Sequence, residues 1–229
     1  MRALLRLLRR LLAVLLAIAL VAAAVVCVRG YGMYRAALEE RPVEQAVGEA
    51  RASAGYVRAD ELPETYLRAV VAVEDHRFYD HPGIDVIALC RAAWHDLTTL
   101  SLEQGGSTIT QQLAKNLFFS QEKDFSRKVA EALMALDLEA RYSKGEILEL
   151  YVNTSYFGDG RTGIGPAARG YLGKEPGAMT PCECALMAGL PNAPNALSAD
   201  PALALARRDL VIAQMERYGF AGPGSIVCP

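Results

Sequence analysis

Residues 126–142 read SRKVAEALMALDLEARY and carry the clearest helical pattern in the chain. An apolar residue recurs every three or four positions, at Val129, Leu133, Leu136 and Ala140. That spacing places the four side chains on one face of a helix, where they form an apolar stripe. Ser126 belongs to the residue types that cap helix N-termini. The stretch therefore predicts an amphipathic helix that begins at Ser126.

The segments on both sides repeat this pattern. A helical segment begins after Leu62 and leads into Glu74, and further helices are predicted over residues 84–97, 108–117, 144–152, 164–172, 181–190 and 201–218. Pro181 and Pro201 suit the first turn of their helices, where a missing N–H costs nothing. The alternation of period two that indicates strands is missing from the sequence. The chain is therefore predicted to be mainly α-helical.

The first 28 residues differ in composition from the rest of the 229-residue chain. They hold four arginines, no acid and an apolar run of 18 residues at 11–28. A helix of that length spans ~27 Å, close to the roughly 30 Å of a bilayer's apolar core. We expect a basic cytoplasmic segment at 1–10, a transmembrane helix at 11–28 and the remainder outside the cytoplasm. A cleaved signal peptide is the alternative.

The overall composition is that of this apolar segment added to an ordinary domain. The whole chain is 52% hydrophobic with a formal net charge of −2; beyond residue 28 these values become about 47% and −6. This composition argues against a disordered chain and a multi-span membrane protein, and it gives no basic excess for nucleic acid. Residues 29–60 show no clear apolar period and are predicted to be a linker or stalk, followed by one domain at 61–229.

The five cysteines carry little information in the sequence. Cys182 and Cys184 are too close to bridge each other easily, and no pair of pairs typical of a metal site is present. We expect the cysteines to be small buried side chains.

Two polar segments interrupt the helices. Residues 74–83, EDHRFYDHPG, place a dense set of titratable groups between two apolar helices. Residues 105–116, GGSTITQQLAKN, place a double glycine before a helix that either Ser107 or Thr108 can cap. A helix N-terminus with Lys115 on the same helix suits an anionic ligand.

A third polar segment adds Lys123, Arg127, Lys128 and Glu131. Singly, these features have ordinary explanations: Arg127 and Glu131, four apart, would form a solvated ion pair. The spacing of His76 and His81 fits no common zinc motif, so each is expected to be a structural histidine. Residues 120–123 match the S-x-x-K pattern of penicillin-binding active sites by chance, because no lysine–threonine–glycine partner follows.

Taken together, the polar segments resemble those of the family-51 peptidoglycan glycosyltransferases. This family comprises monofunctional transglycosylases and the N-terminal domains of class A penicillin-binding proteins. The resemblance covers about residues 60–220 and rests on five stretches in order: 74–83 (EDHRFYDHPG), 106–116 (GSTITQQLAKN), 127–139 (RKVAEALMALDLE), 144–158 (KGEILELYVNTSYFG) and 183–191 (ECALMAGLP). It implies a lysozyme-like, mainly helical fold with a small membrane-dipping subdomain.

The resemblance also implies an activity, the polymerisation of lipid II into β-1,4-linked glycan. Glu74 would be the base that takes a proton from the acceptor's sugar 4-hydroxyl, which attacks C1 of the donor with inversion. Glu131 would help to stabilise the departing polyprenyl pyrophosphate, and Lys115, Arg127 and Lys128 would hold its phosphates. The other implied substrate-binding residues are Asp75, Phe78, His81, Gly106, Ser107, Thr108, Gln111, Gln112, Asn116 and Lys123.

The expected partners are lipid II, the growing glycan strand, the cytoplasmic membrane, and cell-wall synthesis or division proteins. No cofactor is required on this interpretation and no metal cluster is evident, while Mg²⁺ or Mn²⁺ remains an open alternative. The helix at 84–97, with Trp94, is either the membrane-dipping part or an ordinary core helix.

Some departures and rival functions accompany the resemblance. Lys123 stands where many members carry arginine, which removes a bidentate phosphate contact. No transpeptidase domain follows Pro229, so we expect either a monofunctional enzyme or a truncated chain. A lysozyme-like hydrolase or lytic transglycosylase is the first alternative function, but it needs no cationic pyrophosphate site. A non-catalytic cell-wall scaffold is the second, against which the full set of charged residues argues.

Overall fold

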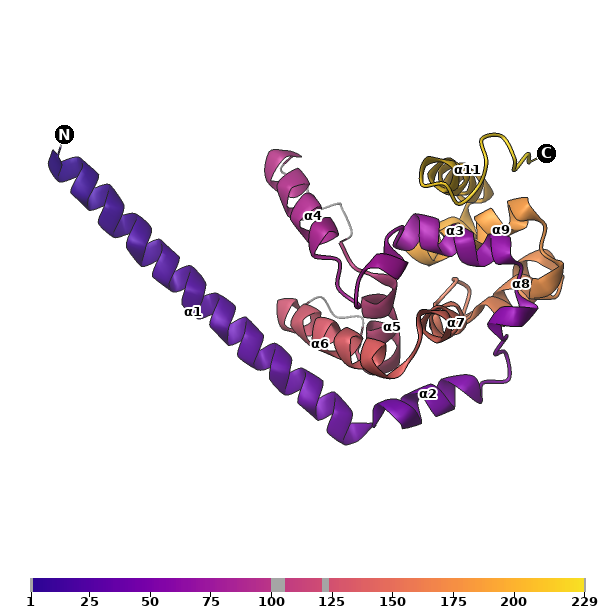
Figure 1. The fold of residues 1–229 in the computed structure, drawn as a ribbon, viewed down its shortest axis with the longest axis horizontal. Coiled ribbons are helices and arrows are strands. Elements are labelled where there is room, and N and C mark those ends of the chain that lie inside the picture. The colour runs from indigo at the N-terminus through magenta and orange to yellow at the C-terminus, as the bar shows by residue number, and fades with distance from the viewer. Residues whose placement is uncertain (1, 100–105, 121–123, 229) are drawn as a thin grey trace.

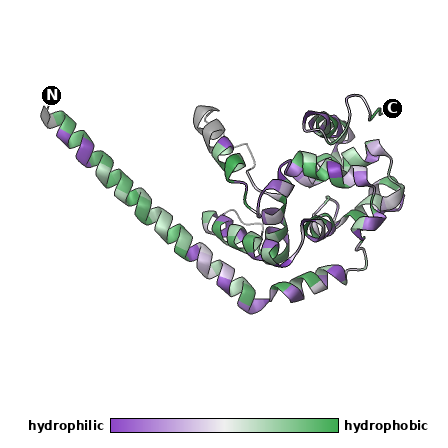
Figure 2. Ribbon diagram, viewed as in Figure 1, coloured by the Kyte–Doolittle hydropathy of each residue, from purple (hydrophilic) through white to green (hydrophobic). Residues whose placement is uncertain are grey.

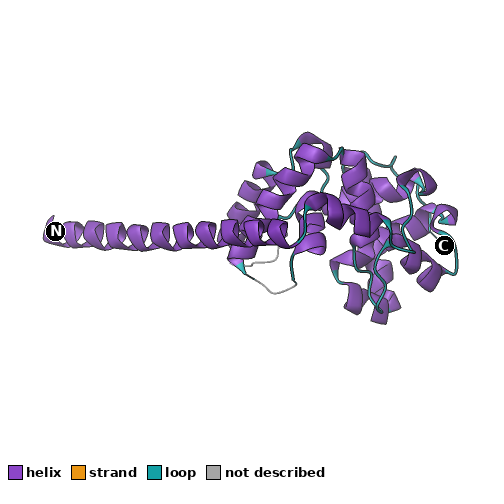
Figure 3. Ribbon diagram, turned by 90° about the horizontal axis from the view of Figure 1, so that it is seen from below, coloured by secondary structure: helices purple, strands orange, loops and turns teal. Residues whose placement is uncertain are grey.

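The computed structural model of the protein describes residues 2–99, 106–120 and 124–228, without the side chains of residues 2, 3 and 93–99 (Figure 1). Helices dominate, and the described residues contain no strand (Figure 3). The helices are α1 (Arg2–Glu40), α2 (Val43–Arg51), α3 (Glu64–Glu74), α4 (Val86–Thr99), α5 (Ile109–Phe118), α6 (Phe125–Arg141), α7 (Lys144–Thr154), α8 (Ile164–Leu172), α9 (Pro181–Gly189), α10 (Pro194–Ala199) and α11 (Pro201–Arg217). The predicted mainly α-helical fold is thus confirmed.

Helix α1 projects from the rest of the molecule (Figures 1 and 3). Its residues 4–40 reach a mean hydropathy of 3.2 over an 18-residue window that has no buried residue. In Figure 2 the projecting half is largely hydrophobic. Within the described residues, α1 is the one helix that is long and apolar enough to cross a membrane. This agrees with the single apolar helix predicted from the sequence.

The structure differs from the linker predicted over residues 29–60. Helix α1 continues unbroken to Glu40, and its C-terminal part packs along α6. Helix α2 then packs on the domain through the buried residues Val43, Ala46 and Val47. The helix was not predicted because only this one narrow face of α2 is apolar, so the composition of the segment as a whole is polar.

A close contact at Gly30 joins α1 to α6. A Cβ atom at this position would lie 2.5 Å from Val129 Cβ and 2.6 Å from the Ser126 carbonyl oxygen, whereas one at Gly32 would meet nothing within 4 Å. The Tyr34 hydroxyl donates to Asp137 Oδ2 at 3.3 Å further along the same contact. Helix α1 is therefore fixed directly to α6 and is not joined to it through a flexible segment.

Helix α6 also differs from the prediction in its start and its buried face. It begins at Phe125, and Asp124 caps it by accepting a hydrogen bond from Ser126 N at 2.9 Å. The apolar residues that it buries in the core are Ala130, Met134, Ala135 and Leu138. Leu136 of the predicted stripe is 42% exposed, while Val129 meets α1. The predicted stripe missed the core face because α6 packs on two sides and its core face also carries polar residues.

The core lies between α3, α5, α7, α9 and α11. Its largest fully buried side chains include Tyr66 of α3, Leu113 of α5 and Tyr151 of α7. Helix starts follow local capping signals: Thr108 caps α5 in a capping box with Gln111, and Pro181 and Pro201 occupy the first turns of their helices as predicted. These caps set where α5 begins and hence where its polar side chains lie.

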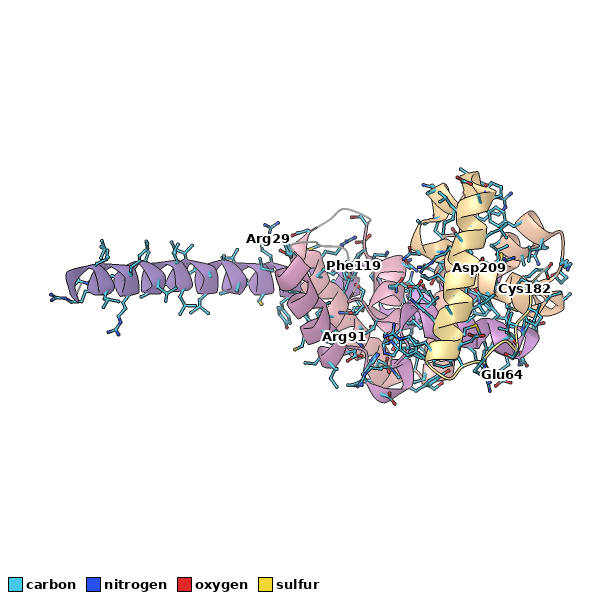
Figure 4. The ribbon with its side chains drawn as sticks, turned by 90° about the horizontal axis from the view of Figure 1, so that it is seen from above. Arg29, Glu64, Arg91, Phe119, Cys182 and Asp209 are labelled. Atoms are coloured by element: carbon cyan, nitrogen blue, oxygen red, sulfur yellow. A yellow bond between two sulfur atoms is a disulfide. The ribbon has the colours of Figure 1, made fainter. Side chains whose placement is uncertain are left out.

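A disulfide joins Cys182, at the start of α9, to Cys228 near the C-terminus. The prediction of buried, unpaired cysteines holds for Cys184, which is buried and free, but not for Cys182; Cys27 and Cys90 are free and exposed. The pairing was missed because its partners are 46 residues apart. Figure 4 shows Cys182 on the side of the domain away from α1.

Candidate active site

Glu74 is the last residue of α3 and the centre of the polar cluster. Gln112 Nε2 donates a hydrogen bond to Glu74 Oε2 at 2.9 Å. The other oxygen, Oε1, is shielded from solvent and accepts no hydrogen bond from any described residue. Burial raises the pKa of this carboxyl, while Gln112, Arg207 and Lys115 oppose the rise. Glu74 is thus a carboxylate with one oxygen held and one free.

A second hydrogen bond orients the amide of Gln112. The hydroxyl of Tyr151, a buried residue of α7, donates to Gln112 Oε1 at 3.2 Å. Because this bond occupies the carbonyl end of the amide, the NH₂ end is the one that faces Glu74. Residues from α3, α5 and α7 therefore fix the carboxylate through neutral hydrogen bonds.

Asp75 and His81 tie the segment at 74–83 to the start of α5. His81 Nε2 lies 3.0 Å from Asp75 Oδ2, and Gly83 N donates to His81 Nδ1 at 3.2 Å. Since Nδ1 accepts, Nε2 carries the proton and donates to Asp75. Asp75 Oδ2 also accepts from Ile109 N at 3.1 Å, and Thr108 Oγ1 donates to the Gly83 carbonyl at 2.6 Å.

This network assigns several predicted substrate-binding residues to the interior. Phe78 is fully buried, His81 is 7% exposed, and Gln111 accepts from Thr108 N within the cap of α5. Lys144 Nζ lies 4.3 Å from the centre of the Phe78 ring. The structure therefore places Phe78, His81 and Gln111 behind the polar surface, where they hold its backbone in position.

Asp75, His81 and Asp85 have ligand-type atoms within 4.8 Å of one another. All three are committed to protein partners: Arg77 Nε donates to Asp85 Oδ2 at 3.0 Å, and Ile87 N and Ala88 N donate to Asp85 Oδ1. Both ring nitrogens of His81 are used as described above. The group does not fit a cation site, because its oxygens and nitrogens already satisfy donors that a metal would displace.

Helix α6 contributes an ion-paired cluster around Glu131. Glu131 is completely buried, with Arg127 Nε at 3.1 Å from Oε1 and Lys128 Nζ at 2.7 Å from Oε2. Arg127 is itself buried, and its Nη1 donates to the Ser120 carbonyl at 2.5 Å. Lys128 remains exposed and donates to Ser107 Oγ at 2.9 Å. Arg127 thus faces Glu131 and the Ser120 carbonyl and is not among the residues that line the cavity described next. Its contact with phosphate stays a prediction.

A cavity of about 540 Å³ brings the two clusters together. It is lined by Glu74 of α3, by Gln112 and Lys115 of α5, and by Lys128 and Glu131 of α6. Burial lowers the pKa of Lys115, and Glu131 offsets part of this effect. Glu74 therefore shares a cavity with two lysines, which is an arrangement suited to removing a proton beside a bound anion.

A second cavity of about 320 Å³ is also lined by Glu74. It is lined by Asp75, Gly106 and Thr108 of the predicted residues, with Ser107 common to both cavities. His76 and Tyr218 close one side of it with rings stacked 4.0 Å apart. Asn116 lines neither cavity, and Lys123 falls outside the described residues.

Sequence reasoning missed the contribution of α11. Arg207 and Gln214 line the larger cavity, and Gln214 also lines the smaller one. The spacing along α11 indicates that Arg207 faces inward, because it is four residues before the buried Val211 and therefore shares its helix face.

The chain is similar to known proteins over most of its length. The sequence profile of the Transglycosylase family matches residues 39–216. A Cupriavidus necator protein named as a transglycosylase is 41% identical over 191 residues, which cover 82% of both chains. Penicillin-binding protein 1A is 44% identical over 170 residues in Aquifex aeolicus and 45% over 166 residues in Vibrio cholerae. These matches cover 73% and 71% of this chain but 23% and 20% of the relatives, so the chain spans about a fifth of those two proteins. The chain belongs to the transglycosylase family.

Proposed function

We propose that the protein is a peptidoglycan glycosyltransferase. It polymerises lipid II into β-1,4-linked glycan strands, with inversion at C1 and release of polyprenyl pyrophosphate. The observation that carries the proposal is the shared cavity, which is lined by Glu74 and by the cations Lys115 and Lys128. Glu74 Oε1 accepts no hydrogen bond from the described residues. A hydrolase of finished glycan needs a carboxylic acid but no site for pyrophosphate.

Glu74 acts as the base in this proposal. It takes the proton of the acceptor's 4-hydroxyl, the hydroxyl oxygen forms the new bond to C1 of the donor, and the bond from C1 to pyrophosphate breaks. A sugar hydroxyl is a poor nucleophile, so a positioned base contributes about 10²–10⁴-fold in rate. The raised pKa of Glu74 strengthens it as a base while its free oxygen stays available.

Lys115 and Lys128 hold the leaving pyrophosphate. Negative charge grows on this group as the C1–O bond breaks, and fixed cations stabilise that charge. Glu131 has an indirect part, because it pairs with Arg127 and Lys128 and orients the latter toward the cavity. We propose that Arg127 supports Glu131 from behind.

The membrane position follows from α1 and from the substrate. Helix α1 serves as a retained anchor, since its C-terminal half packs on α6. The arginines before the apolar run favour an N-terminus in the cytoplasm, and the Cys182–Cys228 disulfide suits an oxidising compartment outside it. We propose that α4 dips into the bilayer near the lipid tail, and the exposure of Val86, Ile87 and Leu89 at its start supports this proposal.

The test is polymerisation of lipid II by the purified full-length protein in detergent or liposomes. We expect glycan polymer on electrophoresis, and loss of at least about 10²-fold in rate in the Glu74→Gln variant. Near-normal activity in that variant would remove Glu74 as the base. Release of fragments from finished peptidoglycan, without use of lipid II, would instead favour a lytic enzyme.

Two further experiments test whether the reaction needs a metal ion and whether the protein has protein partners. We propose that no metal is required, so a chelator should leave the rate unchanged, whereas restoration by Mg²⁺ or Mn²⁺ after chelation would show a divalent cation in the reaction. Cell-wall synthesis or division proteins are proposed partners of the anchored enzyme, and co-purification from membranes would detect them.

A further inference from the structure

Arg207 is a charged side chain of the larger cavity, and it forms no ion pair with any of the residues that the structure describes. It lies half-buried on α11, and its Nε atom is shielded from solvent with no hydrogen-bond acceptor among the described residues. Its neighbour Arg208, by contrast, pairs with Asp209 at 2.7 Å; Asp209 is labelled on α11 in Figure 4. Burial of an unpaired guanidinium is costly, so its retention at this wall calls for an explanation.

Charges of both signs surround Glu74. Asp75 follows it directly, Lys115 approaches from α5, and Arg207 approaches from α11. The buried hydroxyls of Tyr66 (α3) and Tyr151 (α7) are neutral, and on α6 Lys128 is paired with Glu131. His76, Arg91 and Arg217 line the smaller cavity, which Glu74 also lines. Lys115 and Arg207 are therefore the cations that favour the charged form of Glu74.

Binding of a pyrophosphate would change this balance. The phosphates would neutralise Lys115 and Lys128, and their own negative charge in the same cavity would disfavour a charged Glu74. Arg207 lines the same cavity but comes from α11, whereas Lys115 comes from α5 and Lys128 from α6. It is thus the cation left to act on Glu74 once the donor is bound.

We infer that Arg207 is a positioning residue, whose guanidinium keeps Glu74 charged while a pyrophosphate occupies Lys115 and Lys128. This inference rests on the proposed function and extends it to α11. It explains why a half-buried arginine, without a carboxylate partner among the described residues, shares a cavity with a carboxylate that must stay ionised to accept a proton.

The test uses Arg207→Met, Arg207→Gln and Arg207→Lys in the full-length protein. Methionine and glutamine keep most of the aliphatic part of the Arg207 side chain. This part packs closely on Gly189, because a Cβ atom added at Gly189 would lie 2.8 Å from Arg207 Cγ. Arg208→Met is the matched control, one residue away and ion-paired outside the cavity. The measurements are kcat and KM for lipid II between pH 5.5 and 9 at about half-unit steps, with thermal unfolding of each variant.

We expect both neutral variants to lower kcat on the acidic limb of the profile, where the rate follows the charged fraction of Glu74, by about tenfold for each unit by which its pKa rises. The rate should recover toward alkaline pH, and KM should stay within about twofold. The pH at the midpoint of the acidic limb should rise more in the profile of kcat than in that of kcat/KM. The reason is that kcat reports the pKa of Glu74 in the substrate complex, whereas kcat/KM reports it in the free enzyme. Arg207→Lys should restore most of the rate, and Arg208→Met should match the wild type.

Three results would overturn the inference. A loss of rate that is equal at all pH values would indicate a structural role, a raised KM with unchanged kcat would indicate a phosphate ligand, and an unshifted profile would exclude any effect on Glu74. Unfolding of both neutral variants alone would also count against it, because it would show that the guanidinium is needed for the fold. Failure of the wild type to use lipid II, or full activity of Glu74→Gln, would overturn the proposed function instead.

Discussion

Two carboxylates, the half-buried Glu74 and the completely buried Glu131, line the same cavity but lie in opposite surroundings. Glu74 has one amide donor and a free oxygen, and no cation lies within ion-pair distance of it among the described residues. Glu131 is completely buried, and each of its oxygens has a cation within ion-pair distance, Arg127 Nε at 3.1 Å and Lys128 Nζ at 2.7 Å, although the geometry of neither contact is that of a hydrogen bond. The first can therefore exchange a proton, whereas the second is committed to holding Arg127 and Lys128 in place. The difference shows that residue type alone does not set a role at this site.

The largest test of this comparison is Glu131→Gln. Removal of one partner from a buried ion pair leaves Arg127 charged and unpaired, so we expect a loss of about 3–5 kcal/mol in the free energy of unfolding. Denaturant unfolding of the purified protein measures this directly. Glu39→Gln is the matched control, since Arg35 and Glu39 form an exposed pair with the same i,i+4 spacing, and it should change stability little.

A small effect for Glu131→Gln would contradict the structural role assigned here. A stable but inactive variant would then make Glu131 a direct participant in the reaction, equivalent in standing to Glu74. The comparison would lose its basis, because both carboxylates would act on substrate.

Local signals explain how far the sequence predicts this structure. Helix α8 is found at its predicted limits, and Thr108 caps α5, because periodicity and capping depend on residues a few positions apart. The orientation of Arg127, the cavity position of Arg207 and the Cys182–Cys228 bond depend on residues far apart in sequence. The motif placed both carboxylates in one site, but only their neighbours distinguish them.

The next prediction tests how α6 is held. Gly30→Ala would force a methyl group against Val129 and the Ser126 carbonyl, so α1 must move away from the helix that carries the cations. Overpacking of this kind costs about 1–3 kcal/mol. Gly32→Ala, two residues on, meets nothing within 4 Å and is the control. It should be neutral or slightly stabilising, because alanine favours a helix.

Thermal unfolding in detergent, together with the rate on lipid II, would measure both variants. We expect Gly30→Ala to lower both values and Gly32→Ala to lower neither. Equal behaviour of the two variants would show that α1 does not support the cationic side of the cavity.

A smaller effect is expected on the Glu74 side, from Tyr151→Phe. This change removes the hydroxyl that orients Gln112 and leaves the ring in the core. One hydrogen bond contributes about 0.5–1.5 kcal/mol, so kcat should fall a few-fold with little change in KM. Tyr56→Phe removes a hydroxyl that donates to Glu149 at 2.7 Å away from the cavity, and it should leave kcat unchanged. An unaltered kcat in Tyr151→Phe would mean that the amide of Gln112 needs no second support.

The smallest expected effect concerns the stability cost of Glu74 itself. Burial raises its pKa in the folded protein, so the folded state disfavours the charged form. The wild type therefore loses stability as the pH rises from the ordinary glutamate value through the raised one, and the loss is constant above it. Glu74→Gln lacks this loss, so its unfolding midpoint should exceed that of the wild type at pH 8 but not at pH 4. The gain should be modest, because Gln112, Arg207 and Lys115 already offset part of the burial. Asp75 is common to both proteins and cancels in the difference. A difference between the two midpoints that does not change with pH would contradict a charged, destabilising Glu74, and would remove the contrast with the fully paired Glu131.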